Sequence, residues 1–378
     1  MPKKPVGPVR ALFVYLANDL VGTLAETADG AIAFQYSESW LSEGYSISPR
    51  SLPLDRTVFV ADRQLFGGLF GVFNDSLPDG WGALLLDRML ASQGVDPATV
   101  GPLERLSIMG STARGALRYA PQSDLGFSQG IHDLDELASH AAELYDNGSV
   151  QDLDAVYAAG GSSGGARPKA YYSDNEGAWL VKFPSRIDPP DVGMLEYDYM
   201  TCAKNCGIQV PEAKLFPSSR CSGYFGTKRF DRKGGERVHM VTASGLLEVS
   251  HRVPSIDYRT LFQLSFFLTG AQDEAEQLFR RACFNVFAHN HDDHSNNFSW
   301  LCEKGVWRMA PAYDLTYSST AFGEHTTTVM GKGDPTTDDL LALAKDAGLP
   351  ERRSKSIAHE VETACRELLR RHGLAHRG

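Results

Sequence analysis

Short apolar runs separated by turn residues dominate the first third of the chain. Alternating patterns at residues 11–16 and 31–36 predict β-strands, with Asn18-Asp19 and Asp29-Gly30 as turns. Apolar residues at helical spacing then predict helices at about residues 79–90 and 102–108. The pattern therefore predicts a small β-rich N-terminal domain over residues 1–120.

The remainder, residues 121–378, alternates helices with strand pairs and ends in helices. We expect helices at about 133–145, 150–158, 195–206, 258–288 with an interruption near Gly270, 338–347 and 352–371. We expect strands at 169–172, 178–183, 210–215, 224–230, 298–302 and 306–310. Together the two regions predict a protein of the α+β class.

Composition and charge narrow the class of protein. The 378 residues are 42% hydrophobic and 22% charged, which is ordinary for a globular protein. The net charge of −10 disfavours binding of the whole surface to nucleic acid or to an anionic membrane. No apolar run approaches the ~20 residues that span a bilayer, and six cysteines without a CxxC pair indicate reduced thiols. We expect a cytoplasmic protein that does not enter membranes.

Five polar features in a fixed order suggest phosphoryl transfer. Residues 160–165 contain four glycines, which predict a mobile loop whose backbone amides can approach phosphates. Lys182 lies in an apolar strand, and Glu196 on the next helix can pair with it. Asp292 precedes Asn297 by five residues, the spacing of a kinase catalytic loop, and Asp314 follows beyond a predicted hairpin as a second metal ligand.

Each feature also has a simpler interpretation when taken alone. The glycine-rich loop resembles a flexible linker and is not a Walker A motif. Lys182 could be a lysine on an edge strand, and Glu196 could be a helix-start acid that complements the helix dipole. A metal hydrolase is a further alternative, with ligands from His289, His291, His294, Asp292 and Asp293, although their spacing fits no specific zinc pattern.

Several segments resemble the HipA-like serine/threonine kinases of type II toxin–antitoxin modules. Residues 73–82 resemble the N-terminal signature F-x-x-L-P-E/D-G, and residues 165–169 resemble the Gly-Ala-x-x-Lys phosphate loop. Further matches are residues 180–184 with the nucleotide-lysine strand, 229–232 with Arg-Phe-Asp-Arg, 292–299 with Asp-Gly-His-x-x-Asn-Phe-Ser, and 311–314 with the metal segment. The resemblance covers nearly the whole chain.

This resemblance implies a protein-kinase-like bilobal core, residues 121–378, behind the N-terminal domain. Its strand-hairpin lobe would span about 155–232 and its helical lobe about 233–378. The implied reaction is transfer of a phosphoryl group from ATP, with Mg²⁺, to a serine or threonine of a translation factor such as an aminoacyl-tRNA synthetase. The implied partner is a helix-turn-helix antitoxin of HipB type, through which the complex would contact DNA.

The resemblance also implies roles for individual residues. Asp292 would be the catalytic base, Asn297 and Asp314 would hold Mg²⁺, and Glu196 would pair with Lys182. Autophosphorylation of Ser162, with Ser163 as the alternative, would expel the loop and switch the kinase off. The implied ATP contacts are Gly164, Gly165, Ala166, Arg167, Pro168, Lys169, Lys182, Lys228, Arg229, Phe230, His294, Asn297, Tyr313 and Asp314.

Two positions depart from the family pattern, and the doubled Asp292-Asp293 leaves two candidates for the base, of which the spacing to Asn297 favours Asp292. Asp293 stands where the family usually has glycine, and Val241-Thr242 follows Met240 where Glu-Asp is common. A small-molecule phosphotransferase of the aminoglycoside/choline kinase type is one rival, although the N-terminal domain argues against it. A catalytically silent corepressor is another, although the intact lysine, base and metal-binding residues argue against that.

Overall fold

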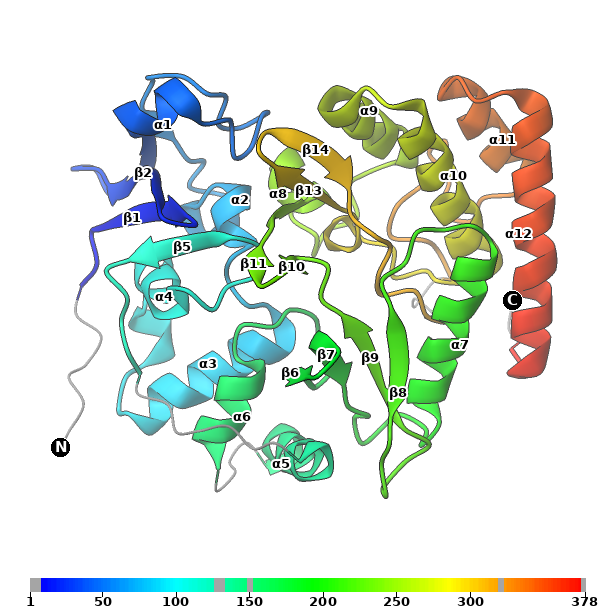
Figure 1. Ribbon diagram of the computed structural model, residues 1–378, viewed down its shortest axis with the longest axis horizontal. Helices are drawn as coiled ribbons and strands as arrows, with labels where there is room; N and C mark the ends of the chain where they lie inside the picture. Colours follow the sequence, from blue (N-terminus) through cyan, green and yellow to red (C-terminus); the bar gives the residue numbers. More distant parts are fainter. Residues whose placement is uncertain (1–7, 126–132, 148–151, 319–322, 375–378) are drawn as a thin grey trace.

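A five-stranded antiparallel sheet forms the beginning of the structure. The computed structural model describes residues 8–125, 133–147, 152–318 and 323–374 (Figure 1). The strand order is β4-β3-β2-β1-β5. Alternation along β1 buries Leu12 and Val14 and leaves Phe13 exposed, so one face of the sheet packs on the core. The strands are β1 (Ala11–Leu16), β2 (Asp19–Glu26), β3 (Ile32–Tyr36), β4 (Phe59–Val60) and β5 (Leu117–Ala120).

Several helices lie between β3 and β5 along the chain, and one of them, α3, packs against elements from beyond residue 150. They are α1 (Glu38–Glu43), η1 (Phe66–Gly68), α2 (Gly71–Asn74), α3 (Gly80–Ser92), η2 (Pro97–Thr99) and α4 (Pro102–Met109). The apolar face of α3, with Trp81, Leu85 and Met89, packs in one cluster with Tyr157 and Trp179 from beyond residue 150. Buried clusters therefore cross residue 120, where we predict the domain boundary.

A four-stranded antiparallel sheet of order β6-β7-β9-β8 forms the next layer. Because β7 lies between β6 and β9, Lys182 is on an interior strand, and its interpretation as an edge-strand lysine is wrong. The predicted helix at 150–158 begins at Leu153, and residues 150–151 lie outside the described residues. The elements are α5 (Leu134–Asn147), α6 (Leu153–Gly160), β6 (Lys169–Asp174), β7 (Gly177–Lys182), α7 (Val192–Asn205), β8 (Ala213–Phe216) and β9 (Tyr224–Lys228).

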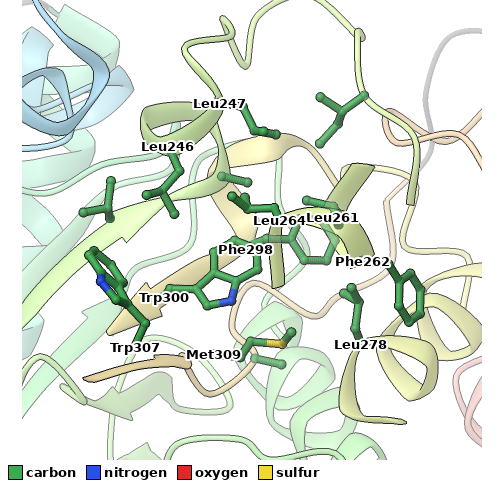
Figure 2. Packing of buried hydrophobic residues seen from close by; sticks show 14 of the residues in the cluster. Leu246, Leu247, Leu261, Phe262, Leu264, Leu278, Phe298, Trp300, Trp307 and Met309 are labelled. Carbon is green, nitrogen blue, oxygen red and sulfur yellow. The ribbon is translucent and has the colours of Figure 1, made fainter. Parts of the chain in front are cut away.

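The last region combines a three-stranded sheet, β12-β13-β14, with helices. Trp300 of β13 is fully buried and lies among Phe298, Leu261 and Leu278 (Figure 2). Gly270, with φ +62°, caps α9 and produces the predicted interruption. The elements are β10 (Arg232–Lys233), β11 (Glu236–Arg237), β12 (His239–Thr242), α8 (Ala243–Leu247), α9 (Tyr258–Thr269), α10 (Gln272–Phe287), η3 (Ser295–Asn297), β13 (Ser299–Glu303), β14 (Val306–Met309), α11 (Thr337–Asp346) and α12 (Glu351–Arg371).

Among the described residues, no helix is both long enough and apolar enough to cross a bilayer. The structure thus combines helix and sheet as the sequence predicts, with an N-terminal β-rich part.

Asp231 joins the N-terminal region to the rest of the chain. Its carboxylate accepts hydrogen bonds from Arg229 at 2.9 and 2.8 Å, from Arg232 at 2.8 Å and from the Gly115 amide at 3.0 Å. Burial would raise the pKa of Asp231, but the bonds and charges of the two arginines outweigh burial and lower it to about 2. The loop before β5 is therefore held to the rest of the chain by a buried cluster of charged groups.

Replacing Asp231 with asparagine should lower the free energy of unfolding by about 3–5 kcal/mol at pH 7, because two arginines lose their carboxylate partner. The pKa is lowered in the folded state, so the stabilisation is complete above about pH 4 and is lost as the pH falls toward 2. Urea denaturation of both proteins from pH 7 downward measures the difference. A difference that stays constant between pH 4 and pH 2 would contradict this assignment.

Candidate active site

A cavity of about 620 Å³ lies where the four-stranded β6-β7-β9-β8 sheet, residues 240–318 and the start of α3 meet. Pro168 is absent from its lining, and the Pro168 carbonyl instead accepts a hydrogen bond from Phe183. Glu196, Ser162 and Ser163 also lie outside the lining. The predicted residues that line the cavity are Gly164, Gly165, Ala166, Arg167, Lys169, Lys182, Lys228, Arg229, Phe230, Asp292, His294, Asn297, Tyr313 and Asp314.

Lys182 lies at the centre of this wall between two carboxylates. Its Nζ is 2.6 Å from Glu196 Oε2 on α7 and 2.6 Å from Asp314 Oδ1. Burial would lower the pKa of Lys182, but attraction by Asp314 and Glu196 raises it above its ordinary value. Burial would likewise raise the pKa of Asp314, and the charges of Lys182 and Lys169 lower it instead. Lys182 and Asp314 are therefore both charged at neutral pH.

The glycine-rich loop is held in place beside Lys169. Lys169 on β6 lies opposite Lys182 on β7 in the register of the sheet. The Lys169 Nζ donates a hydrogen bond to the Gly164 carbonyl at 2.5 Å. Burial lowers the pKa of Lys169 to about 8. Gly165, with φ +82°, accepts a hydrogen bond from the Trp81 amide at 2.9 Å, and its own amide donates to Asp79. These bonds place the loop against α3 and β6 and argue against the linker interpretation.

The neighbouring acids Asp292 and Asp293 have different environments. Asp293 is 1% exposed and accepts hydrogen bonds from the Tyr258 hydroxyl at 3.0 Å and the Thr327 amide at 3.0 Å. His325 Nδ1 lies 3.2 Å from the same carboxylate. The Asp292 side chain is two-thirds exposed at the cavity. Asp293 thus holds the loop, whereas Asp292 is open to a substrate.

Partial desolvation at the cavity raises the pKa of Asp292; the positive charge of His294 opposes this effect, and the negative charges of Asp314 and Asp293 add to it. His294 Nε2 is 3.9 Å from the Asp292 carboxylate. Asn297 donates from its amide to the Asp292 carbonyl at 2.7 Å. Asp292 therefore combines access to the cavity with a raised pKa, as a general base requires.

Asn297 and Asp314 offer the amide and carboxylate oxygens that Mg²⁺ prefers. Both line the cavity, so a metal between them could also reach phosphate oxygens. No group of three histidine, cysteine or acidic side chains among the described residues is arranged to hold a metal. His289 and His291 line a second cavity of about 450 Å³, apart from His294. This separation argues against the hydrolase alternative.

Lys228, Arg229 and Phe230 lie at another part of the cavity wall. The Arg229 guanidinium stacks over the Tyr171 ring at 4.1 Å while it is paired with Asp231. Phe230 and Tyr313 have ring centroids 5.6 Å apart. Arg229 is therefore already paired with Asp231. Its guanidinium would offer a nucleotide a flat surface and not an unpaired charge.

Sequence reasoning missed several residues of the cavity wall. Asp79 belongs to the N-terminal signature, so a closer reading of that motif could have found it. Arg114, His251 and Arg252 carry no signal in the sequence, because long-range folding alone brings them to the cavity. The others are Gly80, Tyr171, Leu180, Phe225, Thr227, Asp231, Met240, Asn290, Asn296, Thr316, Tyr317 and Ser318.

Comparison with known families agrees with this geometry. The HipA-like C-terminal domain matches residues 161–368, and the HipA N-terminal domain matches residues 12–120. The chain belongs to the HipA family. This membership confirms the resemblance that the sequence motifs suggested.

Two relatives of this HipA-family chain extend the comparison. A Sinorhizobium fredii protein named "Putative kinase Y4mE" is 26% identical over 408 residues, covering 96% of this chain and 92% of the relative. The Shewanella oneidensis HipA structure, solved with HipB and operator DNA, is 18% identical with a TM-score of 0.71 and covers 96% and 91% of the two chains. The fold is therefore that of HipA, and the family and the named relative support kinase activity.

Proposed function

We propose that this HipA-family protein is an ATP- and Mg²⁺-dependent serine/threonine protein kinase that acts as a toxin. One observation supports it above the others. Lys182, paired with Glu196 and Asp314, lines the same cavity as Asp292 and Asn297. An interior lysine held by a helix glutamate, a base and two metal-binding side chains is the set that kinases use.

Each residue has a role in this reaction. Lys182 and Lys169 attract the phosphates, and the 164–169 loop covers them. Asn297 and Asp314 hold Mg²⁺, which neutralises charge on the phosphates when it is bound. Asp292 accepts the proton of the substrate hydroxyl, and its raised pKa strengthens it as a base.

A protein substrate fits this chain better than a small molecule. The HipA N-terminal domain matches residues 12–120, and small-molecule kinases of the aminoglycoside/choline type do not need it. By analogy with the family, the substrate is a translation factor such as an aminoacyl-tRNA synthetase. The Shewanella HipA structure contains HipB and operator DNA. We therefore propose a HipB-type helix-turn-helix antitoxin as partner, indirect contact with DNA, and a cytoplasmic location.

Ser162 is the better candidate for autophosphorylation. Ser163 is fully buried, and its hydroxyl donates to the Gly160 carbonyl at 2.6 Å. Ser162 is only half-buried. A phosphate adds about −1.5 to −2 charges, and the loop lies against the Asp79 carboxylate. Repulsion would therefore displace the loop and weaken ATP binding.

The change Asp292→Ala should abolish phosphotransfer and leave ATP affinity within about twofold, because the base contacts the substrate hydroxyl and not the nucleotide. Transfer of labelled phosphate and titration with ATP measure the two effects. Asp338→Ala, on the first turn of α11, is a matched control. Near-native phosphotransfer by Asp292→Ala would contradict the proposed mechanism.

Incubation of the wild-type protein with ATP and Mg²⁺ should add one phosphate at Ser162. Ser162→Ala should remove this mass increment, whereas Ser163→Ala should retain it. Intact-mass spectrometry and peptide mapping identify the site, and ATP titration of the phosphorylated protein should show weaker binding. Phosphate only outside residues 160–170, or unchanged ATP affinity, would refute the switch.

A further inference from the structure

The N-terminal region contributes part of the wall of the nucleotide cavity. Asp79, Gly80 and Arg114 line the cavity beside the glycine-rich loop. All three lie within the segment matched by the HipA N-terminal domain, residues 12–120. The chain therefore brings N-terminal residues to the place where the phosphates are expected.

The first turn of α3 is fitted closely to the loop, and α3, α6 and β6 lie near one another in Figure 1. The Trp81 amide donates to the Gly165 carbonyl at 2.9 Å, and the Gly165 amide donates to Asp79 Oδ1. A Cβ at Gly80 would lie 2.5 Å from the Gly165 carbonyl oxygen, and one at Gly82 would overlap the Ser163 carbonyl. No side chain larger than hydrogen fits at either position without moving the loop.

The Arg114 guanidinium also lies close to this loop, beside the Asp79 carboxylate. A Cβ at Gly164 would lie 3.0 Å from Arg114 Nη1 and 2.8 Å from Asp79 Oδ1, so Gly164 leaves room for both groups. Within the described part of the chain, no hydrogen bond or ion pair within 4 Å involves the Arg114 side chain, and the Asp79 and Asp75 carboxylates attract it from farther away. Asp79 is already bonded to Gly165, and the nearby Asp75 carboxylate is bonded to Thr242.

Two other cations of the cavity wall already have carboxylate partners. Lys182 is paired with Glu196 and Asp314, and Arg167 is paired with Asp188 and Glu196. An enclosed charge without a direct partner is costly. A planar guanidinium also binds phosphate through two parallel hydrogen bonds. An anionic group entering beside Gly164 would therefore find Arg114 ready to bind it.

We propose that Arg114 binds a phosphate group of the nucleotide and that Asp79, with the first turn of α3, positions the phosphate-binding loop. This inference rests on the proposed kinase function. It makes the N-terminal region a part of the nucleotide site. Arg114 contacts the ligand, whereas Asp79 acts through the Gly165 amide.

Calorimetric titration with ATP and with adenosine tests the role of Arg114. Arg114→Gln should weaken ATP binding by about 10- to 100-fold, the worth of a charged hydrogen bond, and leave adenosine binding unchanged. Arg114→Lys should lose less, because it keeps the charge. Arg88→Gln, on the exposed face of α3, is the matched control and should bind both ligands as the wild type does.

Two results would overturn the role of Arg114. Unchanged ATP affinity in Arg114→Gln would show that no phosphate contact exists. If Arg114→Gln and Arg114→Lys each lost as much affinity for adenosine as for ATP, the role of Arg114 would be purely structural. A wild-type protein that binds neither ligand would refute the proposed kinase function itself.

Hydrogen exchange of residues 160–168 tests the role of Asp79. Asp79→Ala should increase exchange of these amides and raise the KM for ATP, whereas Asp79→Asn should restore slow exchange because its side-chain oxygen still accepts from Gly165. Asp87→Ala, farther along α3 and paired with Arg105 at 2.9 Å, is the control. Equal exchange in Asp79→Ala and the wild type would overturn the positioning role.

Discussion

The buried ammonium of Lys182 fixes the geometry of the whole site. It connects β7 to Glu196 on α7 and to Asp314 on the segment after β14, each at 2.6 Å. Glu196 is only 3% exposed, so loss of Lys182 would leave a buried carboxylate without its closest cation. Because Asp314 follows the three-stranded β12-β13-β14 sheet and Lys182 lies on the four-stranded sheet, the same contact also holds the two sides of the cavity together.

Buried polar contacts connect the N-terminal region to this centre. Asp231 holds the loop before β5, and Asp75 accepts hydrogen bonds from Thr242 at 2.6 and 2.9 Å. The first turn of α3 supports the glycine-rich loop through Asp79 and Trp81. The N-terminal region and the proposed phosphate site are therefore connected through named contacts.

Local patterns predicted most elements, because hydrophobic period and turn residues act over short distances. The hairpin at 169–182 and the break at Gly270 are examples. The four-residue strand β12 was missed, since only its pairing with β13 reveals it. Motif spacing led to Lys182 and Asp292, but it could not show that Arg229 is committed to Asp231 or that Arg114 reaches the cavity. The position of Arg114 depends on contacts between residues more than a hundred positions apart. The pairing of Arg229 depends on which cations bind the shared Asp231 carboxylate.

The central claim is that the charge of Lys182 organises a phosphate-binding site. Calorimetric titration of Lys182→Met with ATP and Mg²⁺ tests it most directly, because methionine keeps an apolar stem of similar length. Lys233→Met, whose lysine is two-thirds exposed and paired with Glu303, is the control. We expect an affinity about 10- to 100-fold weaker in Lys182→Met and unchanged in the control. A folded Lys182→Met protein that binds ATP as tightly as the wild type would contradict this claim.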